Sequence, residues 1–137
     1  MSTVQISWYD PEQTIICTEY SGAWTWDDFH ATLEAVVDMM QSVNYRVDLI
    51  VAPHRNAVMP KGSSEPHFKR ALQLMPPNFG IQVIVSHGIL SRTVASIFLK
   101  ISKNSAFHNR LFFVTDVDEA HQIILKERQC SAAPTHA

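Results

Sequence analysis

The sequence has few cysteines and no long hydrophobic run. Its two cysteines, Cys17 and Cys130, do not make a disulfide framework, so we expect a reduced, intracellular protein. Apolar runs such as residues 49–52 are far shorter than the ~20 residues that a membrane-spanning helix needs. Residues 1–10 lack the basic start and the apolar stretch of a secretory signal. We therefore expect a cytoplasmic protein without an integral membrane segment.

Sequence motifs of metal sites and of covalent catalysis are also missing. The chain has 7 histidines but neither His-Glu-x-x-His nor Cys-x-x-Cys spacing, so we predict no metal and no cofactor. Ser86, His54 and Asp116 would supply a serine–histidine–aspartate set, yet Gly-x-Ser-x-Gly is absent. Residues 60–64 lack the first glycine of a phosphate loop. These absences favour a binding role over an enzymatic one.

The composition is that of an ordinary globular domain with an uneven charge distribution. Hydrophobic residues make up 46% of the 137 residues and charged residues 18%, which argues against intrinsic disorder. Residues 1–52 contain eight acidic side chains and one basic one, whereas residues 53–115 contain eight basic and one acidic. The basic residues are dispersed and the net charge is −2, so nucleic acid is not an expected partner. The basic half would instead attract small anions.

Local patterns predict a β-hairpin followed by a helix. Val4, Ile6 and Trp8 alternate with polar residues, residues 10–13 have turn chemistry, and residues 14–20 are apolar and β-branched again. Thr25 with Asp28 resembles a capping box, and apolar residues then recur at intervals of three and four to about residue 43.

The rest of the chain alternates between strands and helices. Strands are predicted at residues 47–52, 81–85 and 111–114, with helices around residues 68–75, 90–101 and 117–128; Asp116 with Glu119 suggests a second capping box. Alternation of this kind requires a mainly parallel sheet with right-handed crossovers. We therefore predict an α/β domain with an N-terminal hairpin, a mixed five-stranded sheet and about four helices. A single domain spans residues 1–128, and residues 129–137 form a flexible tail.

This element order, with Ser-Gly-Ala-Trp-Thr-Trp-Asp-Asp-Phe at residues 21–29 and Arg-Val-Asp-Leu-Ile-Val at residues 46–51, resembles the STAS/SpoIIAA-like superfamily. The resemblance covers residues 4 to about 128 and lies at the level of the fold. It implies a regulatory module that binds partner proteins, nucleotides or lipids. The antagonist branch carries a phosphorylatable serine in an Asp-Ser-Ser/Ser-Gly pattern after a central strand. The corresponding residues 51–56 read Val-Ala-Pro-His-Arg-Asn, without that pattern.

A candidate anion site follows from the ends of the parallel strands, where ligands of open α/β sheets usually bind. Hydroxyls, imidazoles and guanidinium groups follow these strands, and they belong to His54, Arg55, Ser86, His87, Ser91 and Arg92. Free N–H groups at a helix start beside Arg92 would hold an anion. A simpler reading makes Ser86 and Ser91 helix caps only. His67 is also expected near this edge.

Two further features concern interaction surfaces. Trp26 falls on the apolar stripe of its helix and is expected in the core, whereas Trp24 belongs either to the core or to a binding or dimer surface. The acidic helix after Thr25 would pair with a basic helix bearing Arg92, Lys100 and Lys103 in a homodimer.

The function predicted from the sequence is that of a non-enzymatic regulatory or ligand-binding module. Its partner would be a small anionic, amphipathic or lipid-like ligand, a protein, or a second copy of the chain. The alternative is a small hydrolase or transferase that uses a histidine at the same edge of the sheet.

Overall fold

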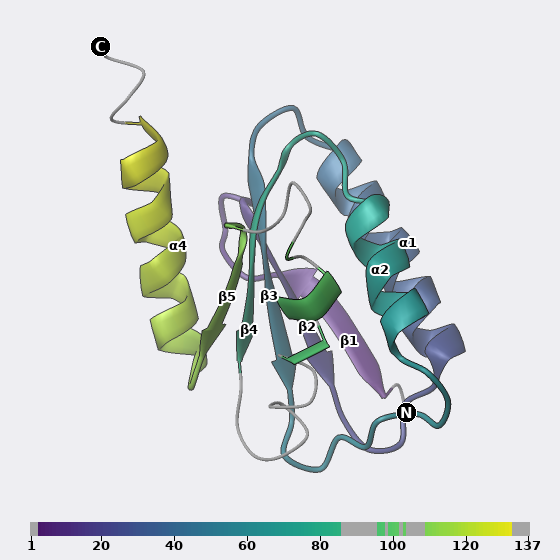
Figure 1. Cartoon of the computed structure of the whole chain (residues 1–137). Helices are drawn as coiled ribbons and strands as arrows, with labels where there is room; N and C mark the ends of the chain where they lie inside the picture. Colours follow the sequence, from purple (N-terminus) through teal and green to yellow (C-terminus); the bar gives the residue numbers. More distant parts are fainter. Residues whose placement is uncertain (1–2, 86–95, 98, 102, 104–108, 133–137) are drawn as a thin grey trace.

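The protein folds into one five-stranded sheet with helices on both faces (Figure 1). The computed structural model describes residues 3–85, 96–97, 99–101, 103 and 109–132. The sheet order follows the chain, β1-β2-β3-β4-β5, with β1 antiparallel to β2 and the other neighbours parallel. The strands are β1 (Val4–Trp8), β2 (Ile15–Tyr20), β3 (Val47–Pro53), β4 (Phe79–Val85) and β5 (Leu111–Val114). This confirms the predicted mixed α/β sheet.

The helices divide between the two faces of the sheet. Helices α1 (Trp26–Gln41) and α2 (Glu65–Gln73) lie side by side on one face, and α4 (Val117–Ala132) covers the other (Figure 1). Successive residues of β3 alternate between them: Leu49 packs in the apolar clusters under α1 and α2, whereas Ile50 belongs to the cluster under α4. The central strands are therefore buried on both sides, as parallel strands usually are. In the described part of the chain, no helix has the length and hydrophobicity to cross a membrane.

Helix α1 starts at the predicted capping box. The Thr25 hydroxyl accepts from the Asp28 backbone N–H at 3.0 Å, and the Asp28 carboxylate accepts from the Thr25 N–H at 3.0 Å. The hydrogen bond from the Thr25 N–H, followed by one from the Thr3 hydroxyl, lowers the pKa of the Asp28 carboxylate. A cap of this kind contributes about 1 kcal/mol. The capping box was predicted correctly because it depends only on two residues three positions apart.

Helix α4 differs from its prediction at both ends. Asp116 accepts from the Glu119 N–H at 2.8 Å, as a capping residue does. The Glu119 carboxylate, however, accepts from the N–H and hydroxyl of Thr115 rather than from Asp116, so the capping box is not closed. The helix continues to Ala132, four residues beyond its predicted end, because Gln129 to Ala132 contain no residue that stops a helix. Residues 133–137 lie outside the described residues.

The predicted helix between β4 and β5 is described only in part. Residues 96–97 and 99–101 are helical, and Ile97 and Ile101 pack against the apolar cluster under α1 and α2. The beginning of this segment lies outside the described residues.

A buried carboxylate ties β3, β4 and α4 together. Asp48 has no exposed side-chain surface; its carboxylate accepts from Arg46 at 3.0 Å, from the Ile81 N–H at 2.8 Å and from Arg128 at 2.8 Å. The register of β3 and β4 shifts at this point. Gly80 gives the carboxylate its space, since a Cβ there would lie 2.0 Å from an Asp48 oxygen. The one polar residue in this apolar run is therefore fully paired.

Candidate functional site

The predicted anion site is described only at the end of β3. His54 and Arg55 follow this strand and are exposed. The His54 imidazole lies 3.5 Å from the Glu19 carboxylate, so its nearest charged neighbour is an acid. Ser86, His87, Ser91 and Arg92 lie outside the described residues.

Other predicted site residues make structural contacts. Asp116 caps α4 instead of facing His54 in a catalytic set. His67 lies in α2, where it bonds to His30 and stacks on Trp26. Lys100, a residue of the proposed basic dimer surface, lies 3.4 Å from Glu65 of the same chain. Within the described ranges, no three His, Cys, Asp or Glu side chains are grouped closely enough to hold a metal ion.

The feature best suited to hold a ligand is a cavity between the sheet and the two helices α1 and α2. Its volume is about 70 Å³, and it is partly open to solvent. One probe-sized volume of about 10–15 Å³ holds a water molecule, and an engineered apolar cavity of about 150 Å³ holds benzene. The enclosed volume therefore accepts a short apolar group, and the rest of a longer molecule would extend through the open side of the pocket.

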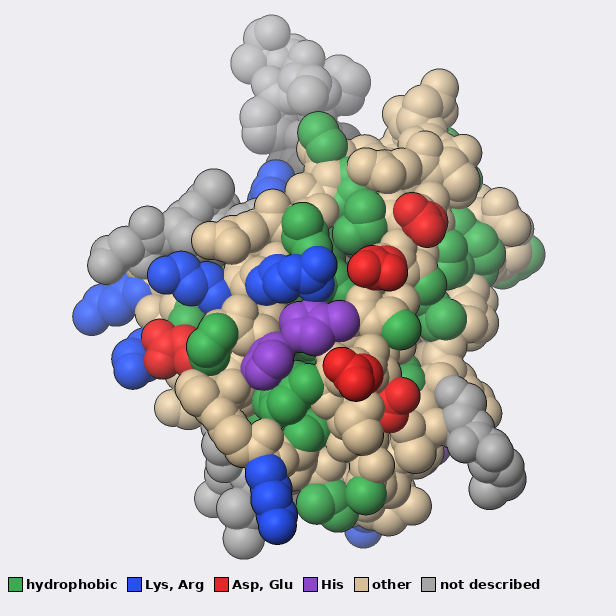
Figure 2. Space-filling view, turned by 90° about the vertical axis from the view of Figure 1, so that its right-hand side faces the viewer, with side chains coloured by type: hydrophobic (Ala, Val, Ile, Leu, Met, Phe, Trp, Pro, Cys, Tyr) green, Lys and Arg blue, Asp and Glu red, His purple; other side chains and the backbone are tan. Residues whose placement is uncertain are grey.

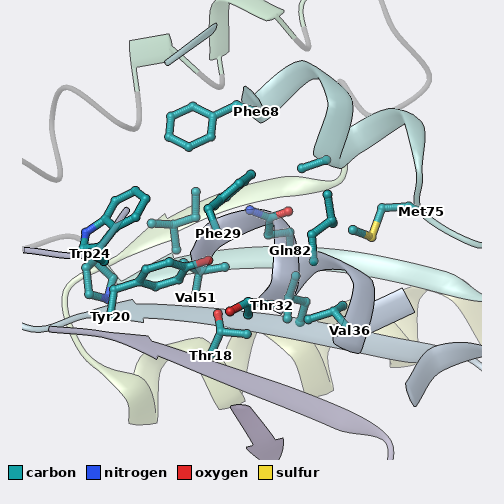
Figure 3. A pocket seen from close by; sticks show the side chains of 15 residues that line it. Thr18, Tyr20, Trp24, Phe29, Thr32, Val36, Val51, Phe68, Met75 and Gln82 are labelled. Atoms are coloured by element: carbon teal, nitrogen blue, oxygen red, sulfur yellow. The ribbon is translucent and has the colours of Figure 1, made fainter. Parts of the chain in front are cut away.

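Fifteen described side chains from β2, β3, β4, α1, α2 and the segment before α1 line the pocket, and most are apolar or aromatic (Figure 3). They are Thr18, Tyr20, Trp24, Phe29, Thr32, Leu33, Val36, Leu49, Val51, Pro53, Phe68, Ala71, Met75, Gln82 and Ile84. Concave sites of this composition, apolar with a few convergent polar groups, are typical of small-molecule binding.

Four polar side chains face this apolar space. Figure 3 shows Thr18, Tyr20, Thr32 and Gln82 directed toward the same region of the pocket. Thr32 donates to the Asp28 carbonyl at 2.8 Å, and Thr18 approaches the Ile50 carbonyl at 3.5 Å. For the Tyr20 hydroxyl and the Gln82 amide, no hydrogen bond is found among the described residues, although Gln82 is only 4% exposed. Burial raises the pKa of Tyr20, so its phenol stays a neutral donor.

Aromatic rings close one end of the pocket, and their positions decide between the two readings of Trp24. Trp24 is 7% exposed and meets the Tyr20 ring edge-on at 4.9 Å, so it is a core residue and not a surface one. Its indole N–H has no hydrogen-bond partner within the described part of the chain. Trp26, expected in the core, is partly buried and stacks on His67 with ring centroids 4.0 Å apart. Trp24 takes the deeper position because it precedes the helix and turns toward the sheet.

The sequence patterns missed this pocket, although two residues carried a signal. Gln82 is the one polar side chain of β4, and Thr18 is a polar residue of β2 that is buried. Both lie on the α1/α2 side of the sheet and line the same cavity. Their convergence depends on the strand register, which the sequence pattern does not give.

A second, more polar pocket of about 370 Å³ lies at the edge of the sheet where β3, β4 and β5 begin. Its lining includes Arg46, which is bound to the buried Asp48 carboxylate, and Asn78, which donates to the carbonyls of Met40 and Tyr45. These side chains hold the fold together. Asn109 and Arg110 in its lining follow residues 104–108, which lie outside the described residues. The candidate site is therefore the cavity under α1 and α2.

Comparisons of the chain with protein-family models, with curated proteins and with solved structures found no match. The functional argument therefore rests on the fold and on the geometry of this pocket.

Proposed function

We propose that the protein binds a small, uncharged amphipathic molecule in the pocket under α1 and α2, and that it acts by binding rather than by catalysis. The observation that carries this proposal is the convergence of four polar side chains, Thr18, Tyr20, Thr32 and Gln82, on a cavity whose other lining is apolar or aromatic (Figure 3). A few convergent polar groups in an apolar pocket are typical of small-molecule sites. A ligand with one hydrogen-bonding group would bind them while its apolar part fills the cavity.

The lining of the pocket determines which ligands fit. Aromatic and aliphatic side chains would surround an apolar group, and Tyr20, Gln82 and the two threonines would bind one polar group. Among the described residues of the lining there is no lysine, arginine or histidine, so a carboxylate or phosphate would lose its water there without gaining a cation from these side chains. A hydroxyl, carbonyl or amide head group therefore suits the pocket better than an anion.

Binding is also favoured over turnover by the side chains in reach of such a ligand. Among the fifteen described residues that line the pocket, none carries a carboxylate, an imidazole, an amine or a thiol. General acid–base and nucleophilic catalysis depend on groups of these kinds. The resemblance of the element order to STAS/SpoIIAA-like domains, which act mainly by binding, supports the same function.

The proposal is tested by titrating ¹⁵N-labelled protein with 1-butanol, 1-hexanol, phenol and hexanoate while recording amide chemical shifts. Small neutral probes of this size are expected to bind with dissociation constants of about 0.1–1 mM. The shifts should concentrate at Thr18, Tyr20 and Gln82 and leave α4 unchanged. Hexanol should bind more tightly than hexanoate, because only the acid is charged.

Two matched variants decide whether the Gln82 amide is involved. Gln82→Leu should abolish most of the hexanol shifts, because it removes the amide that lines the pocket and would bind the hydroxyl of the alcohol. Gln73→Leu makes the same change at an exposed position of α2 and should leave binding unchanged. If no probe shifts the pocket residues, or if Gln82→Leu binds hexanol as well as the wild type, the proposal is wrong. A partner protein then becomes the preferred hypothesis.

A further inference from the structure

Two histidines and an arginine form a hydrogen-bonded chain across the outside of the two helices that cover the pocket. Arg70 of α2 donates to Nδ1 of His30 in α1 at 2.9 Å, and Nε2 of His30 lies 2.7 Å from Nδ1 of His67 in α2. Figure 2 shows the histidines at the centre of this face, between basic and acidic side chains.

The chain of hydrogen bonds fixes the protonation state of both imidazoles. A guanidinium only donates, so Nδ1 of His30 must carry a lone pair. Neutral His30 then has its proton on Nε2 and donates it to Nδ1 of His67, which must also be unprotonated. Both bonds are therefore present together only while both histidines are neutral.

Protonation of either histidine breaks at least one of these two hydrogen bonds. A proton on Nδ1 of His30 places two donors, imidazolium and guanidinium, face to face. A proton on Nδ1 of His67 would face the Nε2–H of His30, so that two donors meet between the rings. If His30 instead carries its proton on Nδ1, that N–H faces the Arg70 guanidinium. Protonation of either imidazole therefore breaks a hydrogen bond, because two N–H donors then face each other.

The groups around His30 shift its pKa in both directions. Burial, Arg70 and His67 lower the pKa of His30, whereas the carboxylates of Asp27 and Glu34 on its own helix raise it, and the net direction is down. The Trp26 ring stacked on His67 tolerates a charged imidazole, since aromatic faces attract cations. Loss of the chain therefore leaves the contact between Trp26 and α2 in place and releases α2 near Arg70.

The same turns of α1 and α2 form the wall of the pocket. Phe68 and Ala71, the neighbours of His67 and Arg70, line it from α2, and Phe29 and Thr32 line it from α1. Helix α2 has only nine residues, and its N-cap residue Ser64 makes no side-chain capping bond. It is therefore the covering element that is most easily displaced.

We propose that the Arg70–His30–His67 chain is a proton-sensitive latch that holds α2 over the pocket, so that acidification loosens α2 and weakens ligand binding. This inference rests on the proposed function, because it concerns the regulation of the same pocket. The ligand would be retained at neutral pH and released where the pH falls below the ordinary histidine pKa of about 6.5.

The test compares hexanol affinity about one pH unit above and one below the ordinary histidine pKa of about 6.5. Loss of one or two hydrogen bonds should weaken binding by about three- to tenfold at the lower pH. His30→Gln keeps one donor and one acceptor but does not titrate, so its affinity should change less than about twofold. His121→Gln is the matched control, because His121 lies in α4 on the other face against Tyr9; it should respond to pH as the wild type does.

Hydrogen exchange of the α2 amides separates failure of the latch from failure of the binding proposal. Protection in α2, relative to α4, should fall on acidification in the wild type and stay constant in His30→Gln. Hexanol binding without a pH dependence, or with the same dependence in His30→Gln, overturns the latch and leaves the binding function intact. If α2 loosens with acid but no probe binds, the proposed function fails, and the latch is then not a gate for a ligand.

Discussion

Removing the buried charge of Asp48 should destabilise the protein more than any surface substitution. Asp48→Asn keeps the size of the side chain but removes the negative charge that Arg46 and Arg128 bind, and its amide NH₂ would face one of these donors. Breaking a buried ion pair by removing one partner costs about 3–5 kcal/mol. The two guanidinium groups retain 30% and 27% side-chain exposure, so water compensates part of the loss. We therefore expect about 3 kcal/mol.

In a domain of this size, that loss corresponds to a fall of about 10 °C in the thermal midpoint. Calorimetry or circular dichroism at neutral pH measures it, with Asp38→Asn at an exposed position of α1 as the control for the change in net charge. Adding Arg128→Met to Asp48→Asn should cost little more, because the interaction is already lost. A midpoint within about 3 °C of the Asp38→Asn value would refute the argument that this carboxylate ties β3, β4 and α4 together.

Three smaller effects follow from single contacts. Thr25→Ala removes the capping hydroxyl that binds the Asp28 N–H and should lower the unfolding free energy by about 1 kcal/mol, measured by urea denaturation. Burial, followed by the Glu19 charge, raises the pKa of Cys17 to about 11 from its ordinary 9.0. In a Cys130→Ser background, iodoacetamide should therefore label Cys17 about a hundredfold more slowly in the folded than in the unfolded protein, and equal rates would contradict this. The pKa of His30 is lowered on folding, so as the pH falls the unfolded chain binds a proton before the folded protein does. The thermal midpoint of the wild type should therefore decrease as the pH is lowered below about 6.5. The decrease should be smaller in His30→Gln.

The parts of the fold that the sequence predicted are those set by neighbouring residues. The Thr25–Asp28 cap depends on a spacing of three, and the helix after it on a period close to four residues. The hairpin follows from one alternating segment, one apolar and β-branched segment, and the turn at residues 10–13 between them. Such signals survive because tertiary packing reinforces them instead of competing with them.

The parts that the sequence could not give are pairings between distant residues. Asp48 was visible as a break in an apolar run, but nothing local indicates that Arg128, 80 residues later, would bind it. Likewise His30 and His67 stand 37 residues apart, and His67 was expected at the sheet edge instead of beside His30. The position of Trp24 stayed open between the core and a surface, because helical periodicity says nothing about a residue that precedes the helix; the structure places it in the core.

The two faces of the sheet differ in a way that indicates where a ligand would bind. Under α4 the core is apolar apart from the Asp48 carboxylate, which is paired with Arg46 and Arg128, and Ile15, Ile50, Val83 and Ile124 are fully buried there. Under α1 and α2 the interior keeps buried polar side chains beside a cavity. Buried polar groups without partners lower stability, so a face that served packing alone would carry apolar residues there. The long helix α4, anchored through Arg128, therefore supplies the rigid half of the fold, and the short helix α2 is the element whose displacement would admit a ligand.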